Sequence, residues 1–169
     1  MCLEAERLAL QQALTLCQAH RAELSDALAD LAKRPLQIQD LANIGKEDRR
    51  ILDQFAYRNT RLQDDMGARL FPAALRALGE DIHPMSVLDR LNRLEQLEWL
   101  ASAEEWIELR RIRNEFTHDY PELAVERFDR LRLAIRSAWR LLDILNTFEQ
   151  STSDYRLNLD SHDDAAADP

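Results

Sequence analysis

Three side chains that can act on a phosphate group lie close together late in the chain. Arg113 is followed by four residues and then His118, and Tyr120 stands one residue beyond the histidine. A guanidinium can hold the non-bridging oxygens of a phosphate while negative charge builds on them. An imidazole titrates near neutral pH and can therefore move a proton during a reaction. The stretch thus has the residue types that a phosphate-binding or phosphate-cutting site needs.

The spacing of these residues restricts how the backbone can run. On one straight helix, the steps from Arg113 to His118 turn through about 140°, so the two side chains would not share a face. Pro121 cannot continue a helix, and it pushes the residue before it out of the helical region. We therefore expect the helix to end between Arg113 and His118, with His118 and Tyr120 on the corner.

The same residues also have an ordinary structural interpretation. Arg113 can be a cation that offsets the dipole at a helix C-terminus, and His118 can be a loop histidine. Tyr120 can be a partly buried side chain whose hydroxyl only forms hydrogen bonds. Asn114, which follows the arginine, can orient a phosphate or the histidine, or can help to end the helix. Spacing alone leaves these alternatives open.

Helical periodicity runs through most of the chain and must position this stretch. Apolar residues recur in steps of three and four, and Ser102 with Glu105 forms a capping-box pattern before the stretch. Helices are expected over residues 3–32, 46–78 and 86–97, from Ser102 into the stretch, and from Pro121 to about Phe148. The prediction is an all-α fold, an up-and-down bundle of four to five helices over residues 1–150.

Prolines and glycines indicate where the helices end. Pro35 ends the first helix, Pro72 is expected to kink or break the second, and Gly79 is expected to stop it. Residues 37–45 form a connector, with apolar side chains tucked against the bundle at Leu36, Ile38 and Leu41. Residues 151–169 lose the periodicity and are rich in aspartate, which predicts an acidic, disordered tail.

Composition bounds the class of protein. The chain has 169 residues, of which 46% are apolar and only three are glycine, as expected for one helical domain. The net charge of -9 argues against a general nucleic-acid coat protein. Cys2 and Cys17 both lie in the first helix pattern and are not spaced as metal ligands, which favours a reducing, cytoplasmic environment. No apolar run is long enough to span a membrane, and no signal-peptide pattern opens the chain.

The pattern RX4HXY formed by Arg113, His118 and Tyr120 resembles the signature of the HEPN superfamily of helical nucleases. Its extended form is similar to the HepT-like toxins of prokaryotic toxin–antitoxin pairs, whose partner is a minimal (MNT-type) nucleotidyltransferase. Residues 55–71, which include Leu-Gln-Asp at positions 62–64, and residues 94–100 also resemble segments of that family. The resemblance covers roughly residues 3–148 and leaves the acidic tail outside.

The resemblance implies a metal-independent endoribonuclease without a cofactor, usually a homodimer whose two motifs meet in a cleft. Arg113 and His118 would be the catalytic residues, with Asn114 in support. RNA carries its own nucleophile, the 2′-hydroxyl, so the chemistry does not require a metal-bound water. Tyr120 resembles the acceptor to which the nucleotidyltransferase antitoxin adds AMP, and a bulky charged adenylate there would block the cleft.

Charge near the motif is compatible with an RNA substrate. Eight arginines and six acidic residues lie between Trp106 and Arg140, so this segment is locally basic in an acidic protein. Two such segments facing each other in a dimer would form a modest basic groove. The alternative is a non-catalytic, nucleotide-binding subunit of a two-part nucleotidyltransferase, in which Arg113 and His118 bind a phosphate and cut nothing. A dimeric bundle without any site is the third interpretation.

Overall fold

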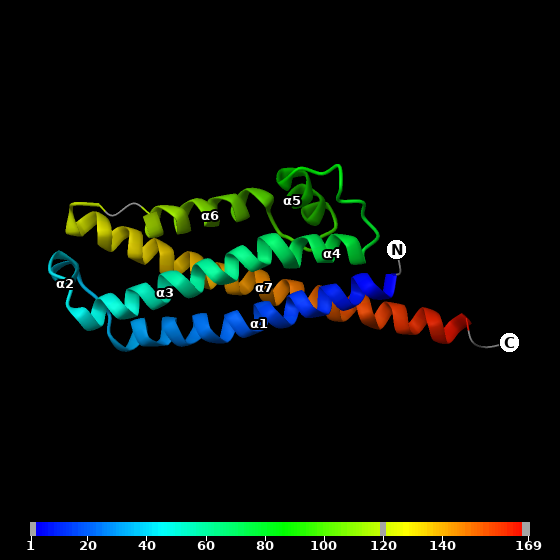
Figure 1. Cartoon of the computed structure of the whole chain (residues 1–169), viewed down its shortest axis with the longest axis horizontal. Coiled ribbons are helices and arrows are strands. Elements are labelled where there is room, and N and C mark those ends of the chain that lie inside the picture. Colours follow the sequence, from blue (N-terminus) through cyan, green and yellow to red (C-terminus); the bar gives the residue numbers. More distant parts are fainter. Residues whose placement is uncertain (1–2, 119–120, 167–169) are drawn as a thin grey trace.

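The computed structural model describes residues 3–118 and 121–166, with side chains as far as Arg156. Four long rods run up and down, as Figure 1 shows, and they make an all-helical bundle. They are α1 (Leu3–Lys33), a composite rod, α6 (Ala103–His118) and α7 (Ala124–Ala166). The composite rod joins α3 (Lys46–Asp65), the π-helix η1 (Met66–Leu70) and α4 (Phe71–Ala77). Two short helices, α2 (Ile38–Ala42) and α5 (Val87–Gln96), lie at opposite ends of the bundle.

The expected fold class is confirmed, and no strand occurs among the described residues. The apolar stripes predicted from periodicity form the core. On α1, for example, Leu14, Cys17 and Leu24 are buried, and on α3 Phe55 and Leu62 are fully buried. A helix with one apolar stripe is stable only when another element covers that stripe, and four rods arranged in this way cover each other.

An aromatic cluster fixes α6 against the composite rod and α7. The Phe71 ring lies 4.4 Å from the Trp106 ring and 4.8 Å from the Phe148 ring, measured between centroids. Trp99, at the start of the turn before α6, packs edge-on to Phe148 with centroids 5.7 Å apart. Tight aromatic contacts among three rods give α6 a defined position, and α6 carries the candidate site.

Helix ends follow the predicted capping signals. The Ser102 hydroxyl accepts a hydrogen bond from the Glu105 amide at 3.1 Å, at the start of α6. Gly79 has φ +86°, and its amide donates to the Arg76 carbonyl while the Glu80 amide donates to the Leu75 carbonyl. These two bonds are those of a Schellman motif, which favours glycine at the left-handed position.

Pro72 interrupts the composite rod, as predicted. The chain widens into η1 just before it, and the Phe71 amide donates to the Met66 carbonyl, five residues back. A proline has no amide to donate, so the π-helical turn shifts the hydrogen bonds around the missing donor. The rod changes direction at this point and runs on into α4 (Figure 1).

One expectation about apolar contacts is wrong. In the connector Leu36 and Leu41 are buried, but Ile38 is 39% exposed because it begins the short helix α2. On α5, Leu91 and Leu94 are buried, whereas Val87 is 60% exposed. A helix as short as α5 buries only one narrow stripe of side chains against the bundle. Val87 is on the first turn of α5 and lies outside that stripe.

The last helix differs from the prediction at both ends. It begins at Ala124 and not at Pro121, because Arg127 binds the carbonyls of Pro121 and Glu122 and so holds them outside the helix. It also continues past Phe148 to Ala166. Residue 151, at which the predicted tail begins, therefore lies inside α7, and the first turns after it pack on the core.

That packing is specific. Thr152 is 4% exposed and bonds to the Phe148 carbonyl, and the Tyr155 hydroxyl donates to the Ala77 carbonyl at 2.6 Å. The Tyr155 bond satisfies a carbonyl at the C-terminal end of α4. Within the described residues, none of the helices has the length and apolarity to cross a bilayer.

Candidate active site

Arg113 lies on the inner side of α6 and is 8% exposed. Its Nε donates to Gln63 Oε1 at 3.1 Å, and its Nη2 donates to Asp64 Oδ1 at 2.9 Å. Both partners belong to α3, so the guanidinium links the two helices. Its remaining terminal nitrogen, Nη1, makes no hydrogen bond to another described residue. The arginine is thus held in one orientation, with the N–H groups of Nη1 left without a partner among the described residues.

Gln63 and Asp64 are site residues that sequence reasoning did not assign. Gln63 is 2% exposed and lies on the same face of α3 as Phe55 and Leu62. A glutamine at a core position of a helix is itself a signal, because a buried amide needs a partner from elsewhere in the fold. The pattern cannot say which residue that partner is, since Arg113 is fifty positions away.

The helix does not end between Arg113 and His118, and that prediction is wrong. His118 is the last residue of α6, and the Thr117 hydroxyl donates to the Arg113 carbonyl at 2.8 Å, one turn back. The steric restriction from Pro121 acts on the residue before it, so the helix can persist to within three residues of the proline. Arg130 of α7 donates to the Glu115 carbonyl at 3.2 Å and so satisfies one carbonyl at this end of α6.

Arg113 and His118 therefore point to different sides of one helix. The angle between them is about 140°, as on any continuous α-helix. His118 is exposed and shares its face with Asn114, about 40° away, and with the half-exposed Ile107. The structure thus brings together Asn114 and His118, and places Arg113 with Gln63 and Asp64 on the inner side. Tyr120, the predicted AMP acceptor, lies outside the described residues.

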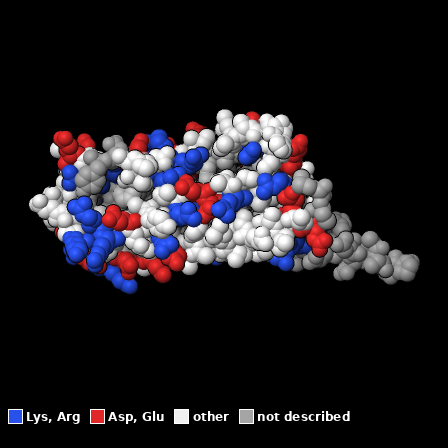
Figure 2. Space-filling view, viewed as in Figure 1, with Lys and Arg blue, Asp and Glu red and all other residues white. Residues whose placement is uncertain are grey.

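Much of the positive charge near the site is already paired. Arg111 bonds to both Glu108 and Glu115, and its guanidinium holds the pKa of the Glu108 carboxyl below its ordinary value. Arg140 forms a two-bond pair with Glu105, which raises the pKa of the arginine. Figure 2 shows basic and acidic side chains interspersed on the face it presents. The basic groove expected from the count of arginines is therefore weaker than the count indicates.

Arg110 is the cation closest to the site that lacks a partner among the described residues. It is exposed, lies one turn before Asn114, and borders two hollows. One hollow, of about 340 Å³, lies over the exposed face of α6 between Ile107 and Glu115. The other, of about 300 Å³, is lined by Gln63, Asp64 and the Trp106 ring. A chain of phosphates following α6 would pass Arg110 on its way to His118.

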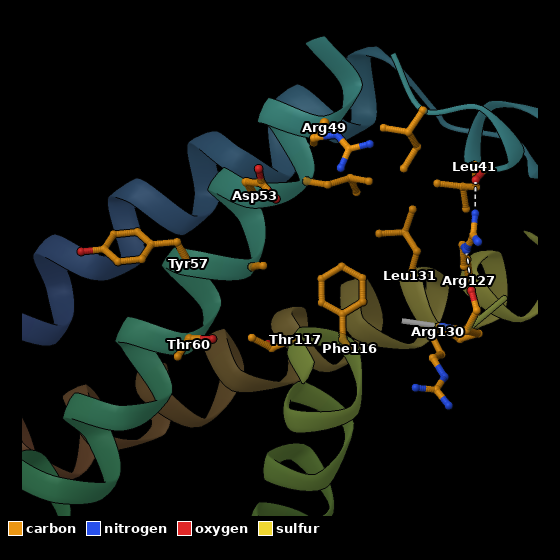
Figure 3. Close-up of a pocket in the computed structure, with 14 residues that line it drawn as sticks. Leu41, Arg49, Asp53, Tyr57, Thr60, Phe116, Thr117, Arg127, Arg130 and Leu131 are labelled. Carbon is orange, nitrogen blue, oxygen red and sulfur yellow. Dashed lines mark hydrogen bonds between the residues drawn. The ribbon is translucent and has the colours of Figure 1, made fainter. Parts of the chain in front are cut away.

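The inner side of the motif borders a third and larger hollow. Phe116 and Thr117, which stand between Arg113 and His118, form one wall of a 440 Å³ cavity opposite α3 (Figure 3). Among the described residues, no group of three or more histidine, cysteine or acidic side chains could hold a metal ion.

Comparison with protein families, with curated proteins and with solved structures gives no match to this chain. The functional assignment therefore rests on the RX4HXY pattern and on the geometry around Arg113 and His118.

Proposed function

We propose that the chain is a metal-independent endoribonuclease of the HEPN kind, a HepT-like toxin that cuts RNA with Arg113 and His118. The observation that carries the proposal is the contact between Arg113 and the Leu-Gln-Asp segment. The RX4HXY motif and the Leu-Gln-Asp segment each resemble the HEPN family independently. They are about fifty residues apart in the sequence, and they are in contact in the fold. Leu62, the first residue of the Leu-Gln-Asp segment, is fully buried.

The chemistry assigned to each residue follows from its position. His118, exposed at the end of α6, is accessible to a backbone phosphate and moves the proton of the 2′-hydroxyl or of the leaving oxygen. Arg113 uses its unoccupied Nη1 for a non-bridging oxygen, while Gln63 and Asp64 keep the guanidinium oriented. Asn114 lies beside His118 and orients the phosphate.

A single copy cannot present both side chains to one phosphate from the same side of α6. A second copy that faces the exposed surface of Ile107, Asn114 and His118 would bring two histidines together there, while each Arg113 stays on the inner side of its own α6. This agrees with the homodimer implied by the resemblance. The hollow beside Gln63 and Trp106 would then hold a nucleotide next to the one that is cut.

Cleavage of single-stranded RNA in EDTA tests the enzymatic part. We expect His118→Ala to lose activity by roughly 10²–10⁴-fold, the range for removal of a proton-transfer group. His83→Ala is the matched control, because His83 is equally exposed but lies in the loop before α5. Cleavage by His118→Ala at the rate of the parent chain would contradict the proposal. RNA binding without cleavage in the parent chain would support the non-catalytic binding subunit instead.

We further propose that a nucleotidyltransferase antitoxin neutralises the toxin by adding AMP to Tyr120. The test incubates the purified chain with the cognate transferase and ATP, and locates the added mass by peptide mass spectrometry. Tyr120→Phe should abolish the modification, whereas Tyr57→Phe, which changes an exposed tyrosine of α3, should not. AMP found only on another residue would contradict this part and leave the nuclease assignment untouched.

A further inference from the structure

The 440 Å³ cavity beside the motif is enclosed by four elements. Helices α3, α6 and α7 and the α2 segment all contribute to it, and Figure 3 shows Phe116 at its centre. Its walls are mostly apolar and come from Leu41, Ile44, Leu52, Ala56, Phe116 and Leu131. Cavities of about 300–1,000 Å³ with such walls are typical of small-molecule sites.

Two polar features distinguish this cavity from a packing defect. Thr60 lines it, and the Thr60 hydroxyl is buried without any hydrogen-bond partner. Buried hydroxyls are nearly always paired, so the unpaired Thr60 hydroxyl is an exception in this wall, although it is closed off from the cavity in this conformation. The Arg49 guanidinium stands at the rim and makes no hydrogen bond or ion pair with another described residue.

The charge around the cavity favours an anion. Arg49 points toward the cavity in Figure 3, and Arg127 and Arg130 line it as well. Backbone carbonyls hold both of the latter in place: Arg127 binds the Leu41 carbonyl at 2.8 Å, and Arg130 binds that of Glu115. Asp53 is the one acidic residue among the lining side chains that the structure describes. Arg49 is therefore the cation that an anionic head would meet at the rim, in a protein of net charge -9.

We propose that this cavity binds a small amphipathic anion, with an apolar chain or ring against Phe116 and Leu131 and a carboxylate or phosphate head at Arg49. Its volume corresponds to roughly 15 groups of about 30 Å³, the share of one water in the liquid. A medium-length fatty acid or its phosphate analogue has this size and this division of polarity. The site does not depend on the proposed ribonuclease activity.

Calorimetric titration with decanoate below its micellar concentration tests the proposal on the full chain. We expect saturable binding, and weaker binding of decanol, which has the same chain without the charge. Flotation with phosphatidylglycerol vesicles distinguishes two sources of the bound anion, a free amphiphile in solution and a lipid in a membrane. We expect no co-flotation. Association with vesicles in the absence of decanoate binding would overturn the proposal, as would the absence of any saturable binding.

Two pairs of variants test the assigned location. Ala56→Leu fills the cavity and should abolish binding of both ligands, whereas Gln54→Leu adds the same side chain on the outer face of α3 and should not. Arg49→Gln should weaken decanoate binding about tenfold and leave decanol binding unchanged, because it removes a charge-assisted hydrogen bond. Arg50→Gln, one residue away and outside the cavity lining, should have no effect on either ligand.

A direct measurement covers the case in which a variant does not fold. Methyl NMR spectra of the parent chain with decanoate should show shifts at Leu52 and Leu131, which line the cavity, and none at Leu24, which is buried in the core of α1. Decanoate binding that survives in folded Ala56→Leu, or shifts absent from Leu52 and Leu131, would overturn the assignment.

Discussion

Arg113 shows how one side chain can be structural and functional at once. Its guanidinium is buried, and a buried charge is tolerated only when hydrogen bonds replace its water. The neutral Gln63 amide and the half-exposed Asp64 carboxylate provide those bonds. A cation held in this way keeps its orientation before any phosphate arrives, which is the property that a transition-state stabiliser needs.

Replacing Arg113 by alanine should therefore destabilise the fold as well as remove activity. The change leaves the Gln63 carbonyl buried without a donor, which costs about 1–3 kcal/mol of unfolding free energy. The bond to Asp64 adds little, because that carboxylate is half exposed. Urea denaturation measures the loss, with the exposed Arg136→Ala as the control, expected to be unchanged. Equal stability of Arg113→Ala and the parent chain would show that the contact with α3 is dispensable.

A second prediction for a single residue concerns Cys17 and the dependence of folding stability on pH. Burial raises the pKa of its thiol from 9.0 to about 12, and the nearby Asp65 carboxylate adds to the shift. As pH rises above 9, the unfolded chain ionises its thiol and the folded chain does not, so stability falls between pH 9 and about 12. Because of this thiol, the free energy of unfolding should be lower at pH 10 than at pH 7 by about 1.4 kcal/mol.

Cys17→Ala isolates this effect. Urea denaturation of the parent chain and the variant at pH 7 and pH 10 gives the difference between the two pH values for each protein. The parent chain should lose more stability than the variant on this change of pH. An identical loss in both proteins would mean that the thiol ionises equally in the folded and unfolded states.

At the scale of elements, a glycine controls how closely η1 approaches α6. A Cβ added to Gly67 would lie 3.4 Å from Cζ2 of Trp106, which is an ordinary contact. Gly67→Ala should therefore raise the free energy of unfolding by about 0.5–1 kcal/mol, because a helical glycine gives up more backbone freedom on folding than alanine does. Gly67→Val should lower it by about 1–3 kcal/mol, because its extra methyl groups reach a ring that Phe71 already confines. Thermal unfolding compares the two variants, and a valine variant as stable as the alanine variant would contradict the close packing.

Helix positions could be predicted from the sequence because periodicity and caps are local signals. The starts at Ser86 and Ser102 and the stop at Gly79 each depend on residues within a few positions of the helix end. The ends of α6 and α7 could not be predicted, because they depend on distant partners. Arg130 supports the last turn of α6, and Tyr155 extends α7 by reaching Ala77. The pairing of Arg113 with Gln63 could not be predicted either, because the two residues are fifty positions apart in the sequence.

At the scale of the whole molecule, α7 connects the two ends of the bundle. With 43 residues at about 1.5 Å each, it is about 65 Å long. Its first turns form a wall of the cavity through Arg127 and Leu131, its middle packs on the aromatic cluster, and its later part reaches α4. Thr152 and Tyr155, which composition assigns to a tail, therefore pack on the folded domain.

Truncation should show where the domain ends. A chain that stops at Gln150 loses Thr152 and Tyr155, and with Tyr155 a partly buried hydrogen bond to Ala77 and a ring contact with Trp99. It should be less stable than a chain that stops at Arg156 by about 2–4 kcal/mol, from burial and the lost bond together. Tyr155→Phe in the full chain isolates the bond and should cost about 1 kcal/mol. Urea denaturation compares the three proteins. If the two truncated chains unfold at the same midpoint, the later turns of α7 add nothing to the core, and the boundary at residue 150 is the correct one.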